Sequence, residues 1–151
     1  MRPAVASSSL RRPLPVVKDG ASLTDRANRG IRRHLVLLSL DWTRDKDPRV
    51  PLGHASLLAA LHEADGADVT AISEPINTPG FSLDKLLQSL LLAVHQLPAE
   101  RTDVGIGVYV WNDHYVRSLL VALRSSGFAG RIVLGGPQIS YSGPGLERLY
   151  P

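Results

Sequence analysis

The sequence predicts an α/β domain built on a doubly wound parallel sheet. Short apolar runs rich in β-branched residues alternate along the chain with segments whose leucines recur at helical spacing, and the connections between them are short. Such alternation implies right-handed crossovers between parallel strands, with helices on both faces of the sheet. A chain of 151 residues has room for one such domain.

Four segments are typical of buried strands. Residues 35–40 (LVLLSL) form a continuous apolar run, as expected for a strand that is covered on both faces. Residues 68–72 follow as the second strand and residues 104–110 (VGIGVYV) as the third. Residues 132–134 form the fourth, which a Gly-Gly-Pro turn closes.

Helices are predicted between these strands. The first begins near a proline and ends at a glycine, over residues 51–66. The clearest helix covers residues 82–94, where a serine N-cap precedes leucines at i, i+3, i+4 and i+7 spacing. A third helix covers residues 112–127, and a last one is expected from residue 144 to the end of the sequence.

The fold class is therefore flavodoxin-like or Rossmann-like, without its fifth strand. Domains of this class commonly have five strands, and this sequence stops as the helix before the fifth begins. We expect the fourth strand to be an uncovered apolar edge and the chain to be truncated at its C-terminus. A ligand is expected above the carboxyl ends of the strands, where the strand order reverses.

Charge divides the chain into two parts. Residues 1–33 hold eight Lys and Arg against two Asp, a balance of +6, whereas the rest holds nine basic and twelve acidic residues, a balance of −3. We interpret residues 1–32 as a flexible basic extension rich in Ser, Arg and Pro, and residues 33–151 as the folded domain. Because the domain has no excess positive charge, a nucleic-acid partner is not expected.

Composition excludes several further classes. The sequence has no cysteine, which excludes disulfides, thiolate metal sites, a cysteine nucleophile and a cysteine-held iron–sulfur cluster on this chain. No apolar run has the length of a membrane span, and prolines follow the Arg11–Arg12 pair where an export signal needs apolar residues. The expected location is the cytoplasm, without a membrane partner.

Three motifs together resemble a known family. The first is the loop and helix at residues 50–61 (VPLGHASLLAAL), followed by the GADV run at residues 66–69. The second is the strand at residues 103–112 (DVGIGVYVWN), and the third is the strand and turn at residues 132–140 (IVLGGPQIS). In this order and spacing they are similar to the cobalamin-binding domain that precedes the catalytic barrel in cobalamin-dependent radical SAM enzymes.

The resemblance implies a cobalamin-binding module, with cobalamin as cofactor and partner. In the family a separate barrel binds the iron–sulfur cluster and S-adenosylmethionine, so a radical SAM domain in the full-length or a neighbouring protein is implied as well. No radical SAM activity is expected from this chain alone, and we assign no catalytic residue and no protein metal ligand. The candidate cofactor-binding residues are Asp41, Trp42, Val50, Pro51, Gly53, Tyr109, Trp111, Asn112, Gly135, Gly136, Pro137 and Gln138.

The sequence departs from the family pattern at the lower face of the corrin. Domains that ligate cobalt from below carry D-x-H-x-x-G, and here the Asp position is Pro48 and the His position is Val50. His54 follows the glycine, and we interpret it as a helix residue. The S-x-L motif reads Gly107-Val108-Tyr109. The resemblance therefore implies the base-off, His-off mode of binding.

Two other functions remain open. The rival hypothesis is a degenerate flavodoxin-like domain without cofactor that serves interaction or regulation. The other is a receiver-like switch, which the carboxylates of the loop from Asp41 to Asp47 favour, although Asp113 is a poor phospho-acceptor and the required lysine is absent. The glycines at 135 and 136 suit close approach of a ligand's nucleotide tail to the backbone, but they also suit an ordinary turn.

Overall fold

The computed structural model describes residues 33–44, 46, 51–64, 67–96 and 98–150. The predicted basic extension lies outside the described residues, and so do Pro48, Val50 and Gly66. Within the described ranges, no helix combines the length and apolar character that crossing a bilayer requires.

Four parallel strands form one sheet in the order β2-β1-β3-β4. They are β1 (Arg33–Asp41), β2 (Ala67–Pro75), β3 (Thr102–Gly107) and β4 (Arg131–Gly135). The strand order reverses between β1 and β3, because β2 lies on the far side of β1 and β4 lies on the far side of β3. This arrangement confirms the predicted doubly wound α/β fold, flavodoxin-like and with four strands instead of five in the described part of the chain.

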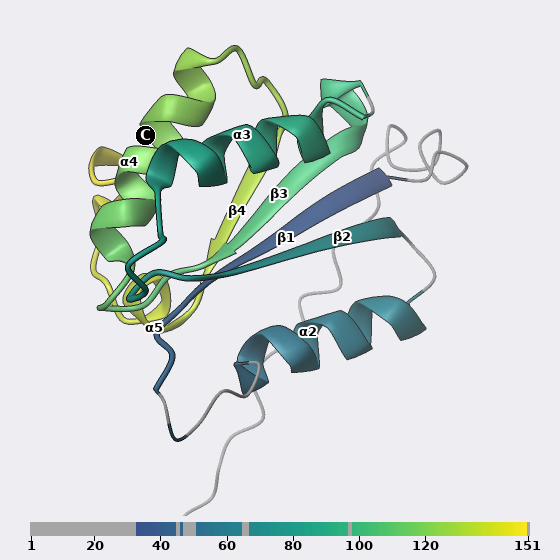
Figure 1. The fold of residues 1–151 in the computed structure, drawn as a ribbon. Helices are drawn as coiled ribbons and strands as arrows, with labels where there is room; N and C mark the ends of the chain where they lie inside the picture. The colour runs from purple at the N-terminus through teal and green to yellow at the C-terminus, as the bar shows by residue number, and fades with distance from the viewer. Residues whose placement is uncertain (1–32, 45, 47–50, 65–66, 97, 151) are drawn as a thin grey trace, which may run out of the picture. The chain divides into compact units, whose positions relative to one another are not determined.

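Helices cover the two faces of the sheet unequally (Figure 1). The helices α3 (Leu83–Val94) and α4 (Asp113–Ser125) pack side by side on one face, whereas α2 (Leu52–Glu63) lies on the other. A short helix, α5 (Pro137–Ser140), follows β4 at the carboxyl edge of the sheet. The face that carries α2 is the less covered of the two.

The main core lies between the sheet and the pair α3 and α4. It contains the side chains of β1 and β3 that point to this face, among them Val36, Leu38 and Ile106, together with leucines of both helices. The helical spacing of these leucines predicted their burial, and Leu90 and Leu119 have no exposed surface. Ser82 begins α3 as predicted, because its hydroxyl accepts a hydrogen bond from the amide of Lys85.

Two predicted elements differ from the structure. The third strand ends at Gly107 instead of residue 110, because the amides of Asn112 and Asp113 both donate to the carbonyl of Tyr109 and turn the chain into α4. No helix begins at Pro144. Gly145 adopts a left-handed backbone with φ of 97°, and only a single 3-10 turn, Leu146–Arg148, follows it.

The prediction of an uncovered edge at the fourth strand is confirmed for the described residues. β4 pairs with β3 on one side only, and Val133 on its α2 face has 59% of its surface exposed. In α2 only His54 is buried, and Leu52 and Leu57 are largely exposed. The α2 face of the sheet is therefore partly open, and this opening positions the candidate site.

Candidate functional site

A cleft of about 700 Å³ lies on the open face of the sheet, between α2 and the strands β1, β3 and β4. Its lining is predominantly apolar and includes Leu35 and Leu37 of β1, Leu57 and Leu61 of α2, and Val133 of β4. At one end it reaches the carboxyl edge of the sheet, where Gly135 and Gly136 follow β4. This is the edge at which doubly wound domains bind their ligands.

Glycines of β3 form the floor of the cleft. A Cβ atom added to Gly105 would lie 3.1 Å from Cδ1 of Leu37, and one added to Gly107 would lie 3.2 Å from Cε2 of Tyr109. Side chains of Leu37 and Tyr109 therefore already occupy the space above the strand at these two positions. At Gly135 an added Cβ would meet nothing within 4 Å. The cleft is consequently open over the end of β4.

Aromatic rings border the carboxyl end of the cleft. The rings of Tyr109 and Trp111 are stacked, with centroids 4.6 Å apart and planes inclined by 8°. The indole Nε1 of Trp111 donates to the carbonyl of Leu40 at 3.4 Å. Trp42, next to the end of β1, is 57% exposed, and Tyr141 after α5 is 90% exposed. The stacked pair of Tyr109 and Trp111 provides a flat apolar surface at this edge, and Trp42 and Tyr141 are further exposed rings that follow β1 and β4.

Tyr109 also connects the floor to the first turn of α2. Its ring lies against Gly107, and a Cβ atom added to Gly53 would be 3.2 Å from its hydroxyl oxygen. The ring thus spans the mouth of the cleft on the α2 side. On the other side, over Gly135, no described atom lies within 4 Å of an added Cβ.

His54 is a polar residue of the cleft lining that the sequence analysis missed, and Ser39, Ser56 and Asp103 also line the cleft. It lies in the first turn of α2, is only 7% exposed and contributes to the lining. The available signal was helical spacing, because Leu57, Leu58 and Leu61 follow it at i+3, i+4 and i+7 and share its face. A histidine at the head of such a stripe is expected to lie on the face of the helix that meets the sheet.

Asp41 is buried at the end of β1, and both of its carboxylate oxygens are used within the protein. One accepts a short hydrogen bond from the hydroxyl of Ser39, and the other accepts from the hydroxyl of Ser73 at 2.6 Å. The three residues tie the ends of β1 and β2 together. Asp41 lies beneath the aromatic border, and its carboxylate is not directed at an open surface.

Asn112 is a structural residue and not a candidate for binding a ligand. Its side chain has no exposed surface. The amide nitrogen donates to the carbonyls of Leu40 at 3.1 Å and Gly107 at 3.0 Å, and the amide oxygen accepts from the backbone of Tyr109 at 2.8 Å. These bonds hold the ends of β1 and β3 at their separation, and they leave Asn112 no group for a ligand. The structure thereby corrects its assignment to the cofactor site.

The backbone around Gly136 also requires a glycine at this position, so the Gly-Gly pair is not explained by ligand binding alone. Its φ is 95°, and an added Cβ would lie 2.6 Å from the carbonyl oxygen of Val108. Gln138 donates its backbone amide to that same carbonyl. Glycine is therefore required at 136 by the backbone itself, whereas Gly135 has space above it and faces the cleft.

The remaining predicted residues lie around this edge. Pro51 precedes α2 at its N-cap position, and Pro137 occupies the first turn of α5. Gly53, Tyr109, Gly135 and Gly136 are brought together as lining of the cleft. Val50 lies outside the described residues. The structure thus gathers part of the predicted set at one place and assigns Asn112 elsewhere.

An ion cluster closes the amino end of the cleft. Asp103 of β3 accepts paired hydrogen bonds from Arg33 at 2.7 and 2.8 Å and from Arg131 at 2.9 Å. The guanidinium groups of Arg33 and Arg131 hold the pKa of the Asp103 carboxyl well below its usual range. Since both partners are cations, the cluster carries a net positive charge.

Asp113, the weak phospho-acceptor candidate, is also engaged. Its carboxylate accepts from Arg117 at 2.6 and 3.1 Å and from the hydroxyl of Tyr150 at 2.5 Å. Among the described residues, no three His, Cys, Asp or Glu side chains group closely enough to hold a metal ion. The engagement of Asp113 disfavours the receiver-like hypothesis, whereas Asp45 and Asp47, whose carboxylates favoured it, lie outside the described residues.

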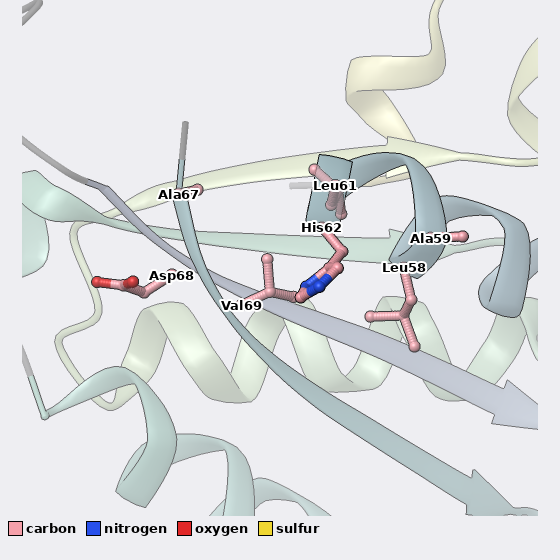
Figure 2. Close-up of a pocket in the computed structure, with 7 residues that line it drawn as sticks. All are labelled: Leu58, Ala59, Leu61, His62, Ala67, Asp68 and Val69. Carbon is pink, nitrogen blue, oxygen red and sulfur yellow. The ribbon is translucent and has the colours of Figure 1, made fainter. Parts of the chain in front are cut away.

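A second pocket lies between α2 and β2, at the amino end of the strand (Figure 2). Its volume is about 720 Å³, and its lining consists of Leu58, Ala59, Leu61, His62, Ala67, Asp68 and Val69. Figure 2 places residues of α2 on one side and residues of β2 on the other. None of the predicted site residues lines it, and it lies away from the carboxyl edge.

Comparisons of this chain with protein-family models, with curated proteins and with solved structures find no match.

Proposed function

We propose that this chain is a cobalamin-binding module that holds its cofactor in the base-off, His-off mode. The observation that carries the proposal is the glycine-floored apolar cleft that opens onto an aromatic border at the carboxyl edge of the sheet. The residues of the motifs that resemble the family contribute directly to this cleft, through Gly53, Gly107, Tyr109 and Gly135.

Cobalamin has two parts with different needs, and the site suits both. The corrin is broad and flat, and the exposed rings of Trp42, Trp111 and Tyr141 offer it a surface at the sheet edge. The nucleotide tail is narrow and ends in an apolar benzimidazole. The cleft is open above Gly135, and we assign the tail to this part, because side chains of Leu37 and Tyr109 already lie over Gly105 and Gly107.

The base-off mode follows from where the tail would lie. A benzimidazole inserted between α2 and β3 is separated from the corrin and cannot ligate cobalt from below. The sequence has no His at the family's lower-ligand position, since Val50 stands there. When bound, cobalamin supplies the organometallic chemistry, and the residues of this chain bind and orient it.

We assign the radical SAM reaction to a different domain. Because the chain has no cysteine, it cannot hold the iron–sulfur cluster of a radical SAM enzyme. We propose that a radical SAM domain, in the same or a neighbouring protein, uses the cofactor that this module presents. A cytoplasmic location stays a prediction from the sequence.

Cofactor retention tests the proposal. Purified protein is mixed with hydroxocobalamin, free cofactor is removed on a desalting column, and the visible spectrum of the protein fraction is recorded. We expect corrin absorption in stoichiometric amount, with the spectrum of base-off cobalamin. Colourless protein that is folded by circular dichroism would contradict the proposal.

The open edge of β4 favours a second candidate, an interaction domain without cofactor. Among the described residues, β4 has one unpaired edge, and this edge with its exposed Val133 is a surface on which another chain can add a strand. This candidate predicts the colourless outcome above. It further predicts that hydroxocobalamin leaves the thermal unfolding midpoint unchanged, whereas a cofactor that binds the folded state raises it.

A further inference from the structure

Trp42 is an exposed aromatic residue on a fixed backbone. It is 57% exposed and directly follows β1 at the carboxyl edge of the sheet. On one side of it, Asp41 is buried, and the carbonyl of Asp41 accepts the backbone amide of Ile76 at 2.9 Å. On the other side, Thr43 is bonded to Asn77. Residues that follow β2 therefore hold the backbone on both sides of Trp42.

Asn77 pairs with Thr43 through three hydrogen bonds. Its Oδ1 atom accepts from the backbone amide of Thr43 at 3.0 Å and from the hydroxyl at 3.2 Å, and its Nδ2 atom donates to the carbonyl of Thr43 at 2.6 Å. One side chain thus binds both backbone groups of Thr43, as a neighbouring strand would do. Asn77 itself is exposed, whereas Ile76 before it lies in the core and fixes the position of the segment.

A fixed backbone makes an exposed tryptophan more effective in binding. Contact between the indole and a ligand removes a large apolar surface from water. The gain in affinity is larger when the side chain is in place before binding, since less conformational freedom is then lost. The hydrogen bonds of Asn77 lie in an exposed place, where water competes with them, so they contribute little to the stability of the fold. Their main effect is on the placement of Trp42.

We propose that Asn77 is a positioning residue, which fixes Trp42 for contact between its indole and the corrin ring of bound cobalamin. This inference rests on the proposed function. The corrin is the flat part of the cofactor, and the face of an indole matches it. Trp42 follows β1, one of the two strands between which the strand order reverses, and ligands of doubly wound sheets bind at that point. A corrin contact there leaves the cleft over Gly135 to the tail.

The test measures the affinity of wild type and three variants for hydroxocobalamin by titration calorimetry. Trp42→Ala should weaken binding at least tenfold, because the aromatic contact is lost. Asn77→Ala should weaken it roughly fivefold, because binding must then immobilise a mobile side chain. Thr43→Val is the matched control. It removes the hydroxyl bond and keeps both backbone bonds to Asn77, so its affinity should stay within about twofold of wild type.

A double variant shows whether Asn77 acts through Trp42. In the Trp42→Ala background, Asn77→Ala should change the affinity by less than about twofold, because the ring that it positions is gone. Fluorescence anisotropy of the free protein supplies a second readout. Trp42 and Trp111 are the two tryptophans of the sequence, so Trp111→Phe leaves Trp42 as the sole emitter. In that background Asn77→Ala should lower the anisotropy of Trp42, whereas Thr43→Val should leave it unchanged.

The outcomes separate the inference from the proposed function. If wild type binds no hydroxocobalamin, the proposed function itself is contradicted. If wild type binds it and Asn77→Ala binds equally well, or weakens binding as strongly without Trp42 as with it, cobalamin binding stands and the role of Asn77 is overturned. An unchanged anisotropy in Asn77→Ala overturns that role as well.

Urea unfolding of each variant identifies any loss of fold. If Asn77→Ala does not fold, Asn77→Asp carries the comparison in its place. That variant keeps the Oδ1 acceptor for Thr43 and sets a carboxylate oxygen against the Thr43 carbonyl, where Nδ2 donates in the wild type. It should weaken binding and lower the anisotropy of Trp42 in the same direction, and wild-type values in both measurements would contradict the proposal.

Discussion

Gly136 lies directly against the carbonyl oxygen of Val108, so closely that a Cβ atom at 136 would approach that oxygen to 2.6 Å. The contact joins the turn after β4 to the chain that leaves β3. The backbone therefore requires glycine at 136. Gly135 and Gly136 both border the cleft, but only at Gly135 does an added Cβ atom meet open space.

Gly136→Ala should therefore destabilise the fold. The side chain adds a backbone clash to the strain of a positive φ, which together cost on the order of 3 kcal/mol in the free energy of unfolding. Gly127→Ala is the matched control, because Gly127 also has a positive φ of 86° but nothing within 4 Å of an added Cβ. Urea unfolding measures both, and an equal loss in the two variants would contradict the proposed contact.

Gly135→Leu should block cofactor retention without loss of stability. The added side chain meets open space and projects into the cleft, where it takes the room assigned to the tail. We expect at least a tenfold weaker binding of hydroxocobalamin and a free energy of unfolding within about 0.5 kcal/mol of wild type. Gly143→Leu, at a glycine with equal space but outside the cleft, should bind normally. Similar binding by both variants would show that the cleft is not used.

Asn112→Ala should destabilise the domain and reduce binding only through that effect. The substitution removes three hydrogen bonds from a fully buried amide, with an expected loss of on the order of 2 kcal/mol or more. Asn112→Asp should be at least as harmful, because a carboxylate would face the carbonyl oxygens of Leu40 and Gly107. Urea unfolding at neutral pH measures both. A stable Asn112→Ala variant that fails to bind cobalamin would restore Asn112 to the ligand site.

At acidic pH, Asp103 should contribute less to the free energy of unfolding. Hydrogen bonds from Arg33 and then Arg131 lower its pKa in the folded state, so its stabilisation is complete above the unfolded-state pKa of about 3.9 and is lost as the pH falls below that value. Asp103→Asn should be less stable than wild type at pH 7 by on the order of 2 kcal/mol. The difference in urea unfolding free energy should shrink between about pH 4 and pH 2. A difference that stays constant over this range would contradict the assignment.

Much of the fold follows from local patterns in the sequence. The leucines of α3 and α4 recur at helical spacing, and the apolar run in β1 is continuous because both faces of that strand are covered. The end of β3 did not follow from propensity, since Val108 to Val110 are good strand formers. The turn there is fixed by hydrogen bonds to Tyr109 and Asn112, which a pattern of hydrophobicity does not contain.

The site was predictable in part. Doubly wound sheets bind their ligands at the carboxyl ends of the strands, and this rule predicted the edge of the sheet at which Gly53 and Gly135 line the cleft. The cleft on the α2 face was not predicted, because it depends on how far α2 covers the sheet, and α2 leaves Val133 of β4 exposed. Asn112 and Gly136 were assigned to the ligand for their residue types. Tertiary contacts give both residues a structural role, and of the two only Gly136 also lines the cleft.

Backbone amide NMR of the isotopically labelled chain, titrated with hydroxocobalamin, tests the central claim most directly. The floor and border of the cleft contain Gly53, Gly105, Gly107 and Gly135, whose amides serve as reporters at the proposed site. The account predicts saturable shifts at these four glycines and none at Gly127 or Gly143. A titration that leaves the cleft glycines unchanged, or that shifts residues of α3 and α4 instead, would contradict it.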